Sequence, residues 1–153
     1  MKPKLYTIGH SNKTIQELLN LLVKSGIEAL VDVRSVPYSK YNPQFNREAL
    51  RTQATARGIK YIYKGKNLGG KGINEDWQEN IDLICDGAKA GRKLCVMCSE
   101  ADPNNCHRQN TIQPDVEKQG IEVEHIIWES KIKKRNGKIK ESRGVGNLQK
   151  SFF

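Results

Sequence analysis

The segment 98–108, with the sequence CSEADPNNCHR, concentrates the side chains that could do chemistry. It contains two thiols, two carboxylates, an imidazole and a guanidinium, at Cys98, Cys106, Glu100, Asp102, His107 and Arg108. A helix that begins near His107 would offer unpaired N–H groups and a positive dipole end, which lower the pKa of a nearby thiol and favour a bound anion. The pattern therefore indicates nucleophilic chemistry at Cys98, with His107 transferring protons and Arg108 holding an anion.

The same thiols allow other interpretations. Cys98 can be a small buried side chain, in which case Glu100 is the candidate general acid or base. Cys98 and Cys106 can form a regulatory disulfide if their Cα atoms come within about 7 Å of each other. Cys95 and Cys98 are chemically suited to zinc, but their spacing on a predicted strand points them to opposite faces. We therefore predict no bound metal, and nothing in the sequence indicates a cofactor.

Other candidate site residues follow the predicted strands. His10 follows the first strand and is a candidate for proton transfer, although a structural histidine is the equal alternative. Asp32 and Arg34 leave the second strand, where they could bind a substrate anion or form an ion pair with each other. The Gly69–Gly70 pair could bind a phosphate through its backbone N–H groups.

Alternating strands and helices are expected to position these residues. Apolar runs predict strands at residues 5–8, 29–33, 59–63, 94–97 and 121–127. Helical spacing and end signals predict helices at residues 14–26, 46–56, 77–91 and 106–119, the first with a Thr14–Glu17 capping box and the last interrupted by Pro114, and a glycine-rich loop at 64–72. The alternation predicts a single α/β domain whose mostly parallel sheet of about five strands has helices on both faces.

This topology also predicts where a site should lie. In open parallel sheets, ligands bind beyond the carboxyl ends of the strands. His10, the Asp32–Arg34 pair, the Gly69–Gly70 loop and the segment 98–108 all follow such ends, so we expect them to converge on one rim of the sheet.

Several short motifs resemble a known family. They are YTIGHS at 6–11, VDVR at 31–34 followed by Pro37 and Ser39, LGG at 68–70, MCSEADP at 97–103 with CHR at 106–108, and HI at 125–126. In this order and at this spacing, they resemble domain-of-unknown-function family 488. The resemblance implies a compact α/β domain of Rossmann-like topology, brings no settled activity, and adds Ser39 to the candidate site. Lys40 departs from the family pattern, which usually has arginine there.

Positive charge is concentrated at the C-terminal end. The 153 residues carry a net charge of +9, and residues 131–153 hold eight lysines and arginines and one glutamate, which is +7. We therefore predict a near-neutral domain at 1–130 and a basic, flexible tail at 131–153, which could contact nucleic acid or only aid solubility. No apolar run is long enough to span a membrane and the start does not resemble a secretory signal, so we expect no membrane partner and a cytoplasmic location.

These features predict an enzyme, a hydrolase or group transferase, that acts on a small anionic or nucleotide-like substrate. In this hypothesis Arg34 and Arg108 hold the anion, and Cys98 or Glu100 reacts while His10 or His107 moves protons. The remaining substrate contacts would come from Asp32, Ser39, Gly69, Gly70 and Cys106. Two alternatives remain open: a non-catalytic nucleic-acid-binding module that uses the tail with Arg34 and Arg108, and a thiol redox sensor that uses Cys98 and Cys106.

Overall fold

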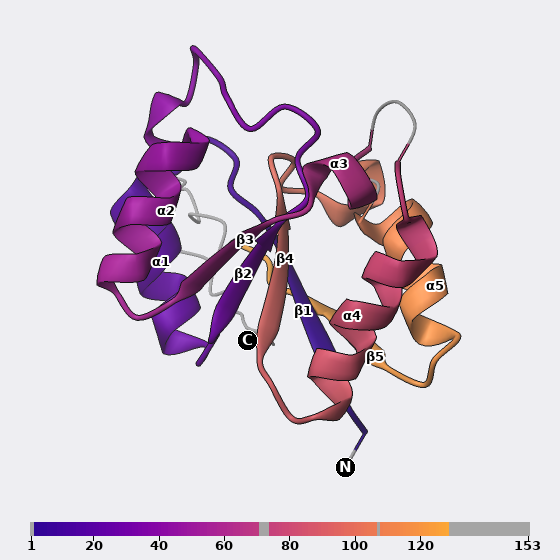
Figure 1. Cartoon of the computed structure of the whole chain (residues 1–153). Coiled ribbons are helices and arrows are strands. Elements are labelled where there is room, and N and C mark those ends of the chain that lie inside the picture. The colour runs from indigo at the N-terminus through magenta and orange to yellow at the C-terminus, as the bar shows by residue number, and fades with distance from the viewer. Residues whose placement is uncertain (1, 71–73, 107, 129–153) are drawn as a thin grey trace, which may run out of the picture.

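An all-parallel sheet forms the centre of the molecule (Figure 1). The computed structural model describes residues 2–70, 74–106 and 108–128, without the side chains of residues 108 and 109. Within this part of the chain the sheet has five strands in the order β3-β2-β4-β1-β5. They are β1 (Lys4–Gly9), β2 (Ala29–Asp32), β3 (Lys60–Tyr63), β4 (Leu94–Cys98) and β5 (Glu122–His125). The predicted α/β fold with a parallel, five-stranded sheet is therefore confirmed.

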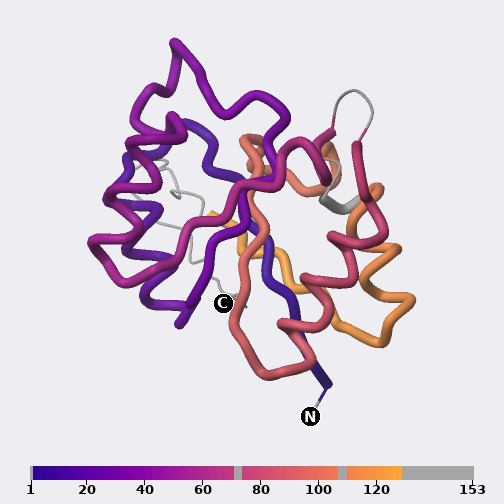
Figure 2. Tube along the Cα trace, in the orientation of Figure 1, coloured from indigo at the N-terminus to yellow at the C-terminus, as the bar shows by residue number. Residues whose placement is uncertain are grey.

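Helices cover both faces of the sheet (Figures 1 and 2). α1 (Ile15–Lys24) and α2 (Arg47–Ala56) lie on one face, and α3 (Gly65–Leu68), α4 (Trp77–Lys89) and α5 (Gln113–Glu117) lie on the other. In the sheet, β4 lies between β2 and β1. The helices that follow β1 and β2 cover one face, whereas the helix that follows β4 covers the other. In open sheets, ligands bind beyond the strand ends at such a reversal.

Local sequence explains why α1 begins where it does. The Thr14 hydroxyl accepts a hydrogen bond from the N–H of Glu17 over 3.0 Å, and the Glu17 carboxylate accepts one from the N–H of Thr14 over 2.8 Å. This is the predicted capping box, which satisfies two N–H groups that the first helical turn leaves unpaired. Leu18, Leu19 and Leu22 then follow one face of α1 and are buried against the sheet.

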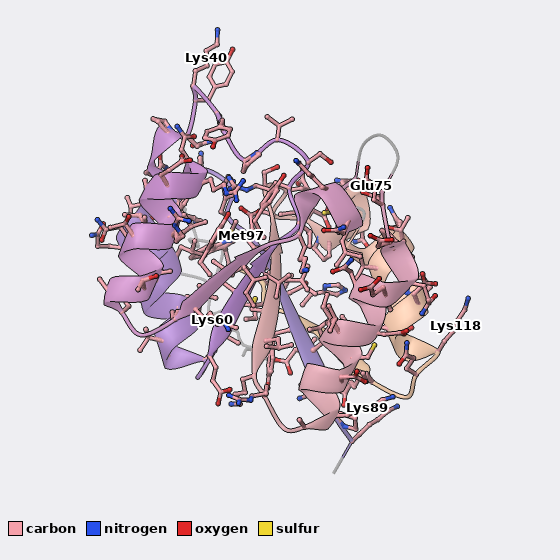
Figure 3. The ribbon with its side chains drawn as sticks, in the orientation of Figure 1. Lys40, Lys60, Glu75, Lys89, Met97 and Lys118 are labelled. Carbon is pink, nitrogen blue, oxygen red and sulfur yellow. The ribbon has the colours of Figure 1, made fainter. Side chains whose placement is uncertain are left out.

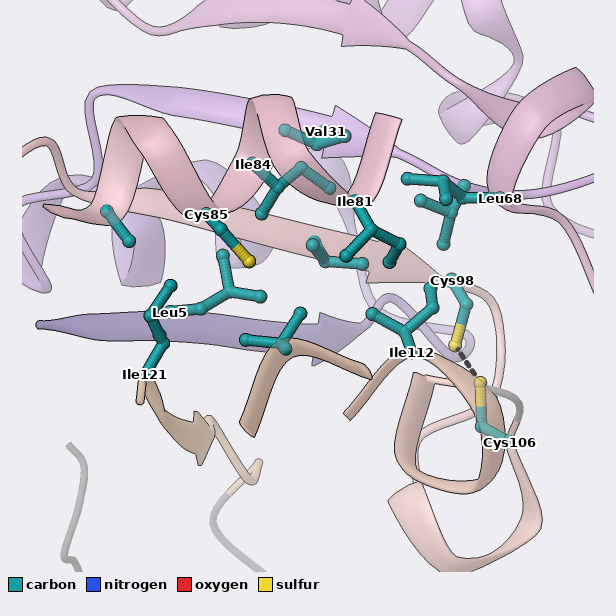
Figure 4. Close-up of a cluster of buried hydrophobic side chains, with 14 residues drawn as sticks. Leu5, Val31, Leu68, Ile81, Ile84, Cys85, Cys98, Cys106, Ile112 and Ile121 are labelled. Atoms are coloured by element: carbon teal, nitrogen blue, oxygen red, sulfur yellow. Dashed lines mark hydrogen bonds between the residues drawn. The ribbon is translucent and has the colours of Figure 1, made fainter. Parts of the chain in front are cut away.

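Hydrophobic side chains form one cluster on each face of the sheet. Val96 and Cys98 belong to the cluster packed by α4 and α5, which Figure 4 shows. Cys95 and Met97 belong to the cluster packed by α1 and α2. Successive residues of β4 thus alternate between the faces, and Cys95 and Cys98 point apart as predicted.

Three predicted elements differ in detail. The glycine-rich loop at 64–72 contains the short helix α3 before the residues that lie outside the description. The helix predicted at 106–119 is divided into a π-helical turn, η3 (Arg108–Ile112), and α5. Pro114 lies in the first turn of α5, the position at which a helix tolerates the missing N–H of proline. The strand predicted at 121–127 pairs with β1 only from Glu122 to His125.

The predicted tail at 131–153 lies outside the described residues, as does His107. The division into a domain at 1–130 and a tail therefore stays a prediction. Among the described helices, none is long and apolar enough to cross a membrane.

Candidate functional site

The chain segments that follow β1, β2 and β4 lie side by side at the carboxyl edge of the sheet. The N–H of His10 donates to the carbonyl of Cys98 over 2.9 Å. On the other side of β4, the N–H of Val33 donates to the carbonyl of Met97 over 3.0 Å. Backbone pairing therefore continues past the strand ends and holds these three segments at one rim, as the topology predicts.

Gly9 allows the loop after β4 to pass close to β1. A Cβ atom placed on Gly9 would lie 1.7 Å from the carbonyl oxygen of Glu100, which is far inside any allowed contact. Any side chain at this position would push the loop away from the edge. The glycine of the 6–11 motif is thus explained by the close approach of two backbones.

The candidate side chains at this rim divide between the two faces of the sheet. Cys98 belongs to the cluster on the α4 and α5 face. His10 and Arg34 instead contact Phe45, which is buried in the cluster on the α1 and α2 face. The structure therefore gathers the candidates at one rim but places the Cys98 thiol on the other side of the sheet from the side chains of His10 and Arg34.

Asp32 and Arg34 form a buried ion pair with two contact points. Nε of Arg34 donates to one carboxylate oxygen of Asp32 over 2.9 Å, and Nη2 donates to the other over 2.8 Å. Nη2 also donates to the Phe45 carbonyl over 2.8 Å, and the Tyr61 hydroxyl donates to Asp32 over 2.5 Å. Asp32 is 0% exposed and Arg34 is 6% exposed. The guanidinium charge is thus balanced inside the protein, which supports the ion-pair interpretation of these residues.

Tyr61 keeps its proton in this cluster. Burial and the neighbouring charge of Asp32 raise the pKa of the Tyr61 phenol well above its usual value. The hydroxyl therefore acts as a hydrogen-bond donor to Asp32, and it completes the set of donors around the buried carboxylate.

His10 is buried beside this ion pair and carries no charge near pH 7. Its Nδ1 lies 2.7 Å from the Ser11 carbonyl, to which it donates, and its Nε2 lies 3.4 Å from Nη1 of Arg34. Its ring packs on Phe45 with the centroids 4.3 Å apart. Burial is the main cause that lowers the pKa of His10 to about 4; the bond to Ser11 opposes the shift, and the charge of Arg34 adds to it. Such a histidine is a weak base at neutral pH.

Cys98 and Cys106 form a pair of buried thiols (Figure 4). Their sulfur atoms lie 2.6 Å apart, and the residues are 3% and 6% exposed. Between them the chain reverses through a short 3-10 turn, η2 (Pro103–Asn105). The Asp102 carboxylate accepts from the N–H of Asn104 over 3.0 Å, and the N–H of Cys106 donates to the Pro103 carbonyl over 3.1 Å. The turn thus returns the second thiol to the first.

Glu100 and Ser39 both stabilise loops. Glu100 is exposed, and its carboxylate accepts from the N–H of Asp102 over 3.1 Å. The Ser39 hydroxyl accepts from the N–H groups of Tyr41 and Asn42 over 3.0 and 3.1 Å. Turn formation is thus sufficient to explain the residue types at both positions.

Gly69 packs tightly against the loop after β2. A Cβ atom at Gly69 would lie 2.3 Å from the hydroxyl oxygen of Ser35. The N–H of Gly69 donates to the Asn74 side chain over 2.9 Å, and that side chain donates back to the Gly69 carbonyl over 2.9 Å. A phosphate could therefore take this N–H only by displacing Asn74. Gly70 is exposed.

Two of the predicted site groups cannot be placed. His107 and the side chain of Arg108 lie outside the described part of the chain, so their roles stay predictions. Among the described residues, no three His, Cys, Asp or Glu side chains gather as a metal-binding group.

Tyr61 and Phe45 belong to the cluster around Asp32, although the sequence does not identify them as its members. The register pairs Asp32 with Tyr63, so Tyr61, two residues earlier in the same strand, shares the face of Asp32. That signal becomes useful only once β2 and β3 are known to be neighbours. Phe45 arrives through an irregular loop, and no local pattern predicts its position.

Comparison with known proteins identifies one family. Residues 14–80 match the family model DUF488, which is described as a domain of unknown function. Over these residues the chain is similar to that family. The matched range contains Asp32, Arg34, Ser39 and the Gly69–Gly70 pair, whereas the thiol pair follows it in the sequence. Searches of curated proteins and of solved structures gave no match.

Proposed function

We propose that this protein is a thiol redox protein in which Cys98 and Cys106 change reversibly between a dithiol and a disulfide. The observation that carries the proposal is the 2.6 Å contact between their sulfur atoms. A disulfide bond is about 2.05 Å long, so small side-chain rotations would bring the two atoms to bonding distance. The expected resting form is the dithiol of a reducing compartment such as the cytoplasm.

The loop between the two thiols is organised for this closure. The Glu100 and Asp102 carboxylates each accept a backbone N–H within it, and η2 turns the chain back toward β4. Little backbone order therefore remains to be gained when the bond forms. The loop-closure model gives a stabilisation of the oxidised form of roughly 2.5 kcal/mol for a ring of this size.

The redox step balances with a hydroperoxide as the oxidant. One thiolate attacks the peroxide, an S–O bond forms as the O–O bond breaks, and water or an alcohol leaves. The second sulfur then attacks the sulfenic sulfur, an S–S bond forms as the S–O bond breaks, and a second water leaves. The two thiols lose two electrons and the peroxide gains them, and a dithiol reductant restores the starting form by exchange.

The test is a residue-resolved map of thiol oxidation in the full chain. The protein is exposed to hydrogen peroxide, alkylated under denaturing conditions and cleaved at Asp102, which separates Cys98 from Cys106. We expect the two peptides to stay joined and to separate only after reduction. The matched control is Cys95→Ala, which removes a buried thiol on the other face and should leave the cross-link unchanged.

Two outcomes would overturn the redox proposal. In one, Cys98 stays fully alkylatable after peroxide in protein that is shown to be folded. In the other, Cys98 and Cys106 are oxidised separately to sulfinic acids, with no cross-link at low peroxide. Either result would mean that the two thiols do not act as a reversible redox pair.

A hydrolase or transferase acting on an anionic substrate is the second candidate. The buried side chains of His10, Asp32 and Arg34 at the carboxyl edge, with the partly buried Tyr61 bound to Asp32, favour it, because ligands of such sheets bind there. It has less support than the redox function, because Arg34 is already bound to Asp32 and to Phe45. Titration with inorganic phosphate, followed by backbone NMR, tests it: shifts at His10 and Arg34 would support it, and their absence would refute phosphate binding there.

A further inference from the structure

The loop between β2 and α2 exposes large apolar side chains to solvent. We call residues 35–46 the aromatic loop. Val36 is 64% exposed, Tyr38 49% and Tyr41 85%. The loop projects beyond the sheet edge in Figure 1, and Figure 3 shows Lys40 at its tip. Aromatic side chains gathered on a projecting surface are typical of a binding site.

The aromatic loop is held in place by its own hydrogen bonds. The Ser39 hydroxyl accepts two backbone N–H groups, and the N–H of Ser39 donates to the Asn46 side chain over 2.9 Å. The N–H of Arg47 donates to the Pro37 carbonyl over 3.0 Å. The tyrosines are therefore exposed in a defined loop conformation. Binding would then cost little conformational entropy, because the loop is already ordered.

Basic side chains lie in and next to the aromatic loop, and Arg47 and Arg51 are close enough to act electrostatically on Tyr38. The guanidinium of Arg47 lies over the Tyr63 ring, 4.5 Å from its centroid. Lys40 and Arg51 are exposed, and residues 36–51 contain a single acidic residue, Glu48. The Glu48 carboxylate accepts a hydrogen bond from the Tyr38 hydroxyl over 2.9 Å, which holds that ring against the first turn of α2.

We propose that the aromatic loop and the first turns of α2 bind single-stranded nucleic acid. Tyr41 and Tyr38 would stack on bases, while Lys40, Arg47 and Arg51 would contact the phosphates. The charge selects a polyanion, and the exposed rings select unpaired bases, because a paired base has no face open to them. The contacts differ from those of Arg34, which is buried in its ion pair.

This binding is independent of the redox function. The aromatic loop follows β2 and precedes α2, whereas both thiols belong to the cluster on the α4 and α5 face. A failure of one proposal therefore leaves the other standing. The same independence supplies a control, because Cys98→Ala should leave nucleic-acid affinity unchanged.

The test is fluorescence anisotropy of the full chain with labelled single-stranded poly-U RNA of about 12 nucleotides, a length within the usual site size. We expect Tyr41→Ala to weaken binding roughly 5-fold to 150-fold, which is the usual effect of losing one stacked base. Tyr41→Phe keeps the ring and should stay within about twofold of the original chain. Leu83→Ala is the matched surface control, because Leu83 is 53% exposed and lies on α4, which covers the face of the sheet opposite to α2. Its affinity should also stay within about twofold of the original chain.

Charge and stacking are then separated. Lys40→Ala should weaken binding and lower the slope of log affinity against log salt by about 1. The proposal is overturned if the chain does not bind the RNA at low salt, which would favour a protein partner for the loop. It is also overturned if Tyr41→Ala binds like Leu83→Ala, or if duplex RNA binds as tightly as the single strand, because charge alone would then explain the binding.

Discussion

Replacing His10 with glutamine should make the stability of the protein less sensitive to acid. His10 is 3% exposed, and Arg34 lies beside its Nε2. The folded protein therefore resists protonation of His10, whereas the unfolded chain accepts a proton at the ordinary pKa. Glutamine keeps a polar side chain at this position and removes the titration.

The size of the effect follows from the two pKa values. The pKa of His10 falls from 6.5 in the unfolded chain to about 4 in the folded protein. Between these two pH values the unfolded state binds more protons than the folded state. The free energy of unfolding is therefore unaffected by His10 above pH 6.5 and decreases as pH falls toward 4. Linkage gives a loss of about 2 kcal/mol at pH 5 and a limit of about 3 kcal/mol below pH 4.

The assay is urea unfolding of both proteins at several pH values between 7 and 4, followed by circular dichroism. Asp32 and Arg34 face His10 in both proteins, so the difference between the two stability curves isolates the histidine. We expect His10→Gln to lose less stability than the original chain by about 2 kcal/mol at pH 5. Parallel curves would show that His10 is accessible to protons in the folded state and would refute the burial argument.

Three further substitutions test the packing of the edge and of α1. Asp32→Asn should destabilise the protein by about 3–5 kcal/mol, measured by urea unfolding, because the Arg34 charge stays buried without its partner. Gly9→Ala should lower the melting temperature, because the new Cβ would clash with the Glu100 carbonyl. Thr14→Ala should cost about 1 kcal/mol in the same unfolding assay, because the capping box is lost.

Matched controls keep these results specific. Glu28→Gln breaks an exposed ion pair with Arg92 and should cost less than about 1 kcal/mol, so an equal cost for Asp32→Asn would refute the burial argument. Gly91→Ala also places a side chain at a glycine, but with open space around it and only the cost of a positive φ, about 1–2 kcal/mol. A Gly9→Ala protein as stable as Gly91→Ala would contradict the close approach of the two backbones.

The fold could be predicted from the sequence because its local signals agree. Alternating apolar strands and amphipathic helices identify a parallel α/β sheet, and the Thr14–Glu17 spacing locates the start of α1. The strand order could not be predicted, since it depends on which strands pair over long separations. The π-helical turn before Pro114 could not be predicted either, because it has no hydrophobic period of its own in the sequence.

The candidate site could be predicted only as a rim. The carboxyl-end rule correctly places His10, Asp32, Arg34 and Cys98 at one edge. It does not say which face of the sheet each side chain takes. The parity of positions along each strand contains that information, since Cys98 shares a face with Val96 and Arg34 shares one with Asp32, but it can be used only after the strand ends and registers are known.

The division of the rim between two faces decides what chemistry the edge can do. A thiol nucleophile needs a base and an anion-binding group on its own side of the sheet. His10 and Arg34 lie on the other side, against Phe45, and Asp32 balances the charge of Arg34. Cys98 instead faces Cys106. A hydroperoxide as oxidant would let each sulfur serve as the reaction partner of the other without either group, and for this reason we propose redox chemistry rather than hydrolysis at Cys98.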